Sequence, residues 1–103
     1  MLNHIINFNN IDWESPIKSV KSKSYKYGSK QLRLVEYTKD MPPHWCSKGH
    51  YGYILEGEFE IEFTNEKIIY KKGDGVFIPD GEQHKHKGRA ITDTVKVFFV
   101  EDL

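Results

Sequence analysis

The 103-residue sequence contains a single cysteine, no excess of charge of either sign and no long hydrophobic run. One cysteine cannot form an internal disulfide, so a disulfide-stabilised domain is excluded and the reducing cytoplasm is the expected compartment. Fifteen basic residues balance fifteen acidic ones, which argues against binding to nucleic acid or to an anionic membrane, because both require a positive surface. The longest aliphatic and aromatic run, residues 97–100, is far too short to span a bilayer.

The length fits one domain, and the hydrophobic share of 38% is low enough that the core must come from strands with one solvated face. Turn-forming residues recur every eight positions, at Gly49, Gly57, Asn65, Gly73 and Gly81. This spacing is typical of an antiparallel sandwich or barrel. We therefore predict an all-β fold, a small antiparallel β-barrel of two packed sheets in the jelly-roll manner. Residues 1–30 are expected to form an N-terminal arm and edge strand packed on the barrel, and residues 31–103 the barrel itself.

Alternation within the predicted strands indicates which face is buried. In residues 58–63, three glutamates alternate with Phe59, Ile61 and Phe63, which predicts an acidic outer face and an apolar inner face. Basic side chains at positions 85, 87 and 89 are predicted to lie on the same outer side and to pair with the glutamates, each pair contributing about 0.2–1 kcal/mol. The only helix that we predict is a turn near residues 10–14, begun by Asn10 and ended by Pro16.

Residues 95–100 are apolar on both faces of the predicted strand, apart from Lys96. A strand of this kind is usually covered on both sides, either by a second sheet or by another subunit. We therefore expect a homodimer.

Four of the five histidines and the only cysteine lie in two short segments. The first contains His44, Cys46 and His50, and the second contains His84 and His86. Residues two apart in a strand project from the same face, so His44 with Cys46, and His84 with His86, can each point into one interior. Two such strands brought together would place imidazoles and a thiolate around one point, which is the outline of a metal site.

These segments resemble the two motifs of the cupin superfamily. The first motif reads His, one residue, His, three or four residues, Glu, six residues, Gly, and these positions are occupied by His44, Cys46, His50 and Gly57. The second reads Gly, five residues, Pro, one residue, Gly, two residues, His, three residues, Asn, and these positions are occupied by Gly73, Pro79, Gly81, His84 and Gly88. The spacing is similar to that of small single-domain cupins.

The resemblance implies four metal ligands, namely His44, Cys46, His50 and His84. Because the motif's glutamate is replaced, these positions do not supply the usual two-His-one-carboxylate iron site, although three histidines remain. The thiolate favours Zn or Ni over Mn, so the expected cofactor is a divalent ion such as Zn, Ni or Fe. Two alternatives for Cys46 remain open, a small buried hydrophobic residue and a thiolate activated by a neighbouring imidazole.

A cavity lined by aromatic residues and a few polar groups suits a small molecule. The candidates for its wall are His86, Trp45, Tyr51, Tyr53 and Phe77. The resemblance leaves two functions open: a metal-dependent enzyme acting on a small polar metabolite, whose reaction the fold does not specify, and a non-catalytic binding or sensing module without metal. The retained imidazoles favour the first function, and the altered motif positions favour the second.

Overall fold

The computed structural model describes residues 4–103, so residues 1–3 of the predicted N-terminal arm lie outside the described residues. The described chain is nearly all β, as the sequence predicts. Among these residues, no helix has the length and hydrophobicity needed to cross a membrane. Two single turns of 3-10 helix, η1 (Phe8–Asn10) and η2 (Glu82–His84), interrupt a series of strands: β1 (Glu14–Ile17), β2 (Val20–Tyr27), β3 (Lys30–Thr38), β4 (His50–Glu56), β5 (Glu58–Phe63), β6 (Lys67–Lys71), β7 (Gly75–Ile78), β8 (His86–Ala90) and β9 (Thr94–Asp102).

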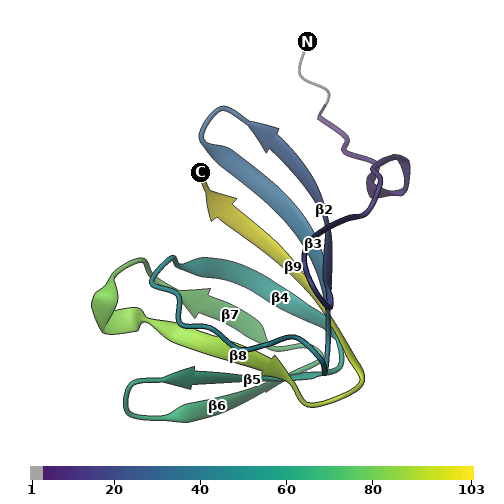
Figure 1. Cartoon of the computed structure of the whole chain (residues 1–103). Coiled ribbons are helices and arrows are strands. Elements are labelled where there is room, and N and C mark those ends of the chain that lie inside the picture. The colour runs from purple at the N-terminus through teal and green to yellow at the C-terminus, as the bar shows by residue number, and fades with distance from the viewer. Residues whose placement is uncertain (1–3) are drawn as a thin grey trace.

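The strands form two antiparallel sheets that face each other (Figure 1). The larger sheet has the order β1-β2-β3-β9-β4-β7, and the smaller has the order β6-β5-β8. The predicted two-sheet antiparallel fold is therefore confirmed. Strands β1 and β2, which belong to the predicted N-terminal arm, form one end of the larger sheet. The last strand, β9, lies in its middle between β3 and β4, which brings the C-terminal segment beside residues far away in sequence.

The hydrophobic core fills the space between the sheets. Alternate residues of β9 point into it, since Val95, Val97 and Phe99 are buried. The outer side of β9 is only partly covered. Phe98 packs against Phe8, with their ring centroids 5.7 Å apart, but Val100 remains 44% exposed. The N-terminal segment thus covers part of the outer apolar face that the sequence predicts for this strand.

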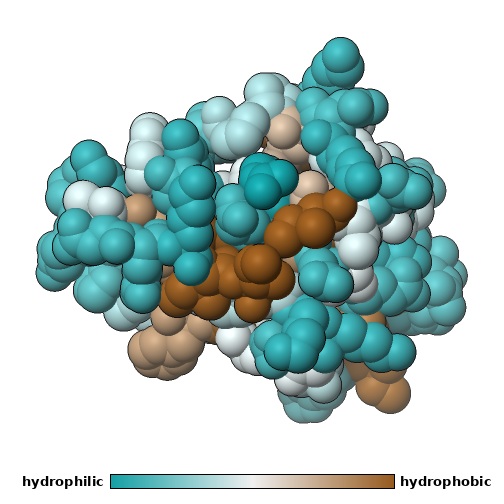
Figure 2. Space-filling view, turned by 90° about the horizontal axis from the view of Figure 1, so that it is seen from below, coloured by the Kyte–Doolittle hydropathy of each residue, from teal (hydrophilic) through white to brown (hydrophobic). Residues whose placement is uncertain are grey.

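The predicted charged rows lie on the outer face of the smaller sheet. In β5, Phe59 and Ile61 are buried, and the glutamates that follow them, Glu60 and Glu62, lie opposite basic residues of β8. Arg89 donates to Glu60 at 2.9 Å, and the Lys87 ammonium lies 4.0 Å from the Glu62 carboxylate. Figure 2 shows the molecule from below, where hydrophilic side chains surround a central hydrophobic patch and further hydrophobic groups lie near the edge of the view. Strands β5 and β8 therefore carry paired charges on this face, and the predicted cross-strand pairing is confirmed for these two pairs.

The helical turn predicted at residues 10–14 lies elsewhere. Helix η1 forms earlier because the Asn7 side chain accepts a hydrogen bond from the Asn9 amide at 3.0 Å and caps the turn. Residues 14–17 form β1 instead, where the Ser15 hydroxyl donates to the Val20 carbonyl at 2.9 Å. This bond across the hairpin favours an extended segment over a helix.

Three of the predicted glycine turns have the backbone conformation that favours glycine. The φ angles of Gly57, Gly73 and Gly81 are 84°, 95° and 127°. Gly81 immediately precedes η2 and so determines where the chain turns toward β8. Gly49, also predicted to lie in a turn, is required for another reason. It lets two backbone segments approach closely, since a Cβ at this position would collide with the Ile78 carbonyl oxygen.

Candidate metal centre

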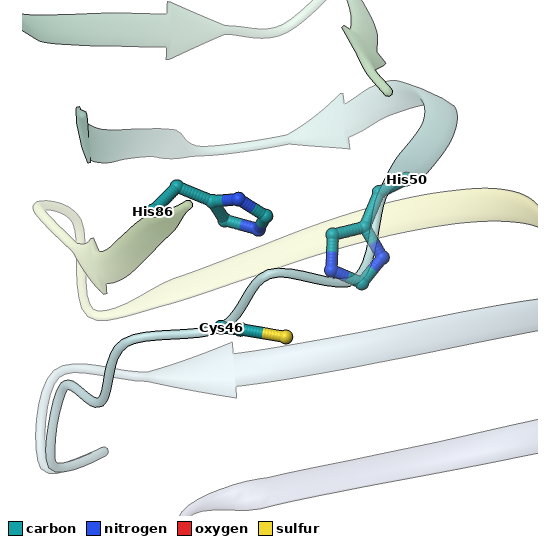
Figure 3. Close-up of side chains that lie close together, drawn as sticks. All are labelled: Cys46, His50 and His86. Atoms are coloured by element: carbon teal, nitrogen blue, oxygen red, sulfur yellow. The ribbon is translucent and has the colours of Figure 1, made fainter. Parts of the chain in front are cut away.

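Three potential ligands converge between the two sheets: Cys46, His50 and His86 (Figure 3). Their ligand atoms all lie within 4.8 Å of one another. His50 is the first residue of β4, His86 is the first residue of β8, and Cys46 lies in the segment that leads into β4. Two strands of different sheets and one connecting segment therefore supply the three side chains.

The backbone fixes Cys46 and His86 relative to each other. These residues form an isolated antiparallel bridge, in which the Cys46 amide donates to the His86 carbonyl at 2.8 Å and the His86 amide donates to the Cys46 carbonyl at 2.9 Å. Directly opposed residues of an antiparallel pair project to the same side. The thiol and the imidazole therefore emerge on the same side of the bridge.

His50 is oriented by a buried carboxylate. Its Nδ1 donates to Glu101 Oε2 at 2.6 Å, and both oxygens of Glu101 also accept hydrogen bonds from Arg33, each at 2.9 Å. Burial raises the pKa of Glu101, but the hydrogen bonds from His50 and Arg33 outweigh this effect and bring the pKa to about 2. The carboxylate is therefore ionised and can only accept, so Nδ1 of His50 carries a proton and Nε2 is the ring nitrogen left for a metal ion.

His86 is held in a similar way by a backbone carbonyl. Its Nδ1 donates to the carbonyl oxygen of His84 at 3.0 Å. Burial lowers the pKa of His86, and the neighbouring rings of His50 and His44 lower it further, against the opposing effect of this hydrogen bond. The neutral ring with a proton on Nδ1 leaves the lone pair on Nε2.

This donor set fits a divalent metal ion. Two neutral imidazoles with free Nε2 atoms and one cysteine sulfur are typical ligands of zinc and related ions. Metal-binding histidines usually donate their second nitrogen to a carboxylate or a carbonyl, and Glu101 and His84 provide these two acceptors. The residues that would hold the ion are therefore Cys46, His50 and His86.

The three side chains open into a cavity of about 270 Å³. His44 and Arg33 also line it, as does Tyr37, whose ring stacks on Phe59 at a centroid distance of 4.8 Å. Most of the remaining wall is apolar and is formed by Val20, Met41, Ile61, Val76, Ile78 and Phe99. The site therefore combines a small number of polar groups with a hydrophobic wall, as small-molecule sites commonly do.

The structure brings together two of the four ligands implied by the motif spacing, Cys46 and His50, and adds His86. His44 lies in an exposed loop and lines the cavity outside the group of three. His84 differs most from the expectation, because η2 takes up residues 82–84 and the strand begins only at His86. Within residues 4–103, the side chain of His84 belongs neither to the ligand group nor to the cavity wall.

The four aromatic residues proposed for the cavity wall lie on the outer surface. Since His50 points inward, the alternation of β4 turns Tyr51 and Tyr53 outward, where they are 37% and 51% exposed. Phe77 pairs with Tyr51 across the sheet and is 77% exposed. Trp45, 46% exposed, lies beneath the ammonium groups of the lysines at positions 85 and 87. Unlike these four residues, His86 lines the cavity.

Arg33 and Glu101 were not predicted as residues of the site. A signal for Glu101 is present, because it continues the inward alternation of Val95, Val97 and Phe99 and therefore stands at a core position. A carboxylate at such a position needs a buried partner. The partner lies 68 residues away on β3, and only the pairing of β3 with β9 reveals it.

Comparisons with known proteins agree with this fold. A family model described as a cupin domain matches residues 33–101. No match was found among curated proteins. Among solved structures, an RmlC-like cupin from Shewanella frigidimarina NCIMB 400 superposes with a TM-score of 0.76 and 15% identity, covering 98% of this chain and 91% of its own. KdgF from Halomonas sp. gives a TM-score of 0.68 with 21% identity, covering 89% and 88% of the two chains.

Apo-HppE is also similar, with a TM-score of 0.75 and 17% identity over 94% of this chain. The chain spans only 56% of the length of HppE. At these identities the structural matches show a shared fold, and the family-model match extends over most of the sequence. The chain belongs to the cupin family.

Proposed function

We propose that this cupin binds a divalent metal ion through Cys46, His50 and His86 and acts as a metal-dependent enzyme on a small polar molecule in the adjoining cavity. The observation that carries the proposal is the convergence of these three side chains at the cavity wall. A bound ion would supply Lewis acidity toward a substrate or water oxygen. A thiolate with two imidazoles favours Zn, Ni or Fe over Mg or Mn.

The chain's own residues prepare this site in two ways. Glu101 and the His84 carbonyl engage Nδ1 of the two imidazole rings, so Nε2 of each ring is the nitrogen that would bind the ion. Apolar side chains form most of the remaining cavity wall. His44, which lines the same cavity, is the residue best placed to supply a further ligand. The reducing cytoplasm, our proposed compartment, would keep Cys46 in its reduced form and so able to bind metal.

The test is the metal content of untagged protein purified without chelators, measured by mass spectrometry for the wild type and for single variants. We expect one ion per chain in the wild type and a loss of metal in His86→Ala and Cys46→Ser. His4→Ala is the matched control, because His4 is exposed and lies outside the site. Protein that holds no metal after loading with Zn, Ni or Fe would contradict the proposal and would favour the non-catalytic binding module.

The proposed partner is a second copy of the chain. An exposed apolar face on the outer side of the larger sheet, formed by Tyr51, Tyr53, Phe77 and Val100, supports a homodimer. Contiguous exposed apolar residues of this kind mark interaction surfaces. Light scattering on the wild type should give the mass of a dimer, and Phe77→Ser should shift it toward the monomer. A wild-type monomer at working concentration would contradict this part of the proposal.

A further inference from the structure

The cavity wall carries a guanidinium group that is only partly used by the protein. Arg33 donates through Nε and Nη2 to Glu101, and its guanidinium carbon lies 5.4 Å from the centre of the Phe99 ring. A guanidinium has five N–H groups. In residues 4–103, no other acceptor lies within hydrogen-bond distance of Arg33, whose side chain is 21% exposed and lines the cavity. Three N–H groups are therefore available to a ligand.

A second donor lies on the same strand and on the same face. Tyr37 is four residues after Arg33 in β3, so both side chains point toward the smaller sheet, and both line the cavity. Within the described part of the chain, the Tyr37 hydroxyl has no hydrogen-bond partner, while its ring is held against Phe59. Burial raises the pKa of Tyr37 to about 12, against the lowering effect of Arg33. The hydroxyl is therefore protonated and can donate.

The charges around the cavity favour a negative ligand. Arg33 presents its guanidinium to the cavity, and among the described residues no aspartate or glutamate lines it. Lys87 also contributes to the wall, but its ammonium lies outside, near Glu62 and the Trp45 ring. Glu101 lies behind Arg33 and neutralises part of its charge. A single carboxylate matches this partly neutralised guanidinium better than a doubly charged phosphate, which would need more positive charge around it.

We propose that the cavity binds a small carboxylic acid, with its carboxylate on the unused N–H groups of Arg33 and the hydroxyl of Tyr37. The apolar part of the ligand would lie against Ile61, Val76 and Ile78, and its other end would face Cys46, His50 and His86. The volume of about 270 Å³ restricts this ligand to a small metabolite. The inference rests on the proposed function, because it takes the cavity beside the three ligands as the substrate site.

The experiment is an NMR titration of the full-length protein with butyrate and with the neutral amide butyramide, after the metal has been removed by a chelator. Removing the metal prevents direct coordination of the carboxylate from being mistaken for binding at Arg33. We expect signals of cavity residues to shift with butyrate and the affinity for butyramide to be about tenfold or more weaker, since the interaction with a charged group is lost. Equal affinities for the two compounds would overturn the inference, and tighter binding of inorganic phosphate would overturn the choice of a carboxylate.

Two variants locate the binding to these residues. Tyr37→Phe keeps the packing on Phe59 and should weaken butyrate binding several-fold, whereas Tyr27→Phe, which changes an exposed tyrosine, should leave it unchanged. The double variant Arg33→Met with Glu101→Gln removes both members of the buried pair, so no charge is left without a partner, and it should abolish the preference for butyrate. Wild-type binding by Tyr37→Phe or by the double variant would contradict the inference.

The metal content of the same preparations separates the two proposals. If the protein never holds metal but still prefers butyrate through Tyr37, the proposed metal-dependent function fails and the present inference stands. If the protein holds metal but binds butyrate and butyramide equally, the inference fails and the metal centre stands.

Discussion

Replacing Glu101 with glutamine should destabilise the protein and weaken its metal site together. The Glu101 side chain is only 2% exposed and accepts hydrogen bonds from Arg33, Gln31 and His50. Because these interactions bring the pKa of Glu101 from its usual 4.5 to about 2, and each tenfold change in an ionisation constant corresponds to about 1.4 kcal/mol, the ionised group is favoured by about 3 kcal/mol. Breaking a buried ion pair at one partner costs about 3–5 kcal/mol, which agrees with this value.

We therefore expect Glu101→Gln to lower the free energy of unfolding by about 3 kcal/mol in urea titrations. Loss of the carboxylate behind His50 should also lower metal affinity by about 10–100-fold. Glu60→Gln is the matched control, because Glu60 makes a similar pair of hydrogen bonds with Arg89 on the outer face, where solvent screens the charges. If Glu101→Gln were as stable as Glu60→Gln and bound metal like the wild type, the role assigned to this carboxylate would be refuted.

Two further predictions concern packing and pH. Gly88→Ala should lower the free energy of unfolding by about 1–3 kcal/mol, because a Cβ at position 88 would lie 2.5 Å from the Phe59 ring. Gly75→Ala is the control, because a Cβ at position 75 would be 3.9 Å from its nearest neighbour, the Gly52 carbonyl oxygen. Equal urea midpoints for the two variants would contradict this prediction. Since the pKa of Tyr37 is raised from 10 to about 12 by burial, its contribution to stability is complete below pH 10 and is lost as the pH rises through 12, a change of up to about 3 kcal/mol. Thermal unfolding should therefore show an alkaline loss of stability that is smaller in Tyr37→Phe, and identical profiles would rule this out.

Local patterns predicted the strands and part of the site. The alternation of glutamate with Phe59 and Ile61 gives the correct inner face of β5, since strand periodicity depends only on neighbouring residues. The same periodicity correctly brings Cys46 toward the interior. Tyr51 was proposed for the cavity because it is aromatic, but the alternation that turns His50 inward places Tyr51 on the outer face of β4. A Cβ at Gly52 would collide with the carbonyl of Phe98, which shows how closely the neighbouring strand approaches.

The sequence does not reveal that His86, rather than His84, joins Cys46 and His50 in the ligand group. Both residues would share a face if the strand began before His84, but the turn after Gly81 continues through η2 and delays the strand by two residues. The His84 backbone carbonyl then orients the ring of His86. Likewise, the partnership of Arg33 with Glu101 depends on which strands are neighbours, a long-range property that no local pattern contains.

The most direct test of the metal centre is the absorption spectrum of the protein after loading with cobalt(II), which reports coordination by a thiolate. The wild type should show a sulfur-to-cobalt charge-transfer band that is lost in Cys46→Ser, lost or strongly altered in His86→Ala, and retained in His84→Ala. A band that survives in His86→Ala but disappears in His84→Ala, or a wild-type protein without the band, would contradict the assignment of Cys46, His50 and His86 as the ligands.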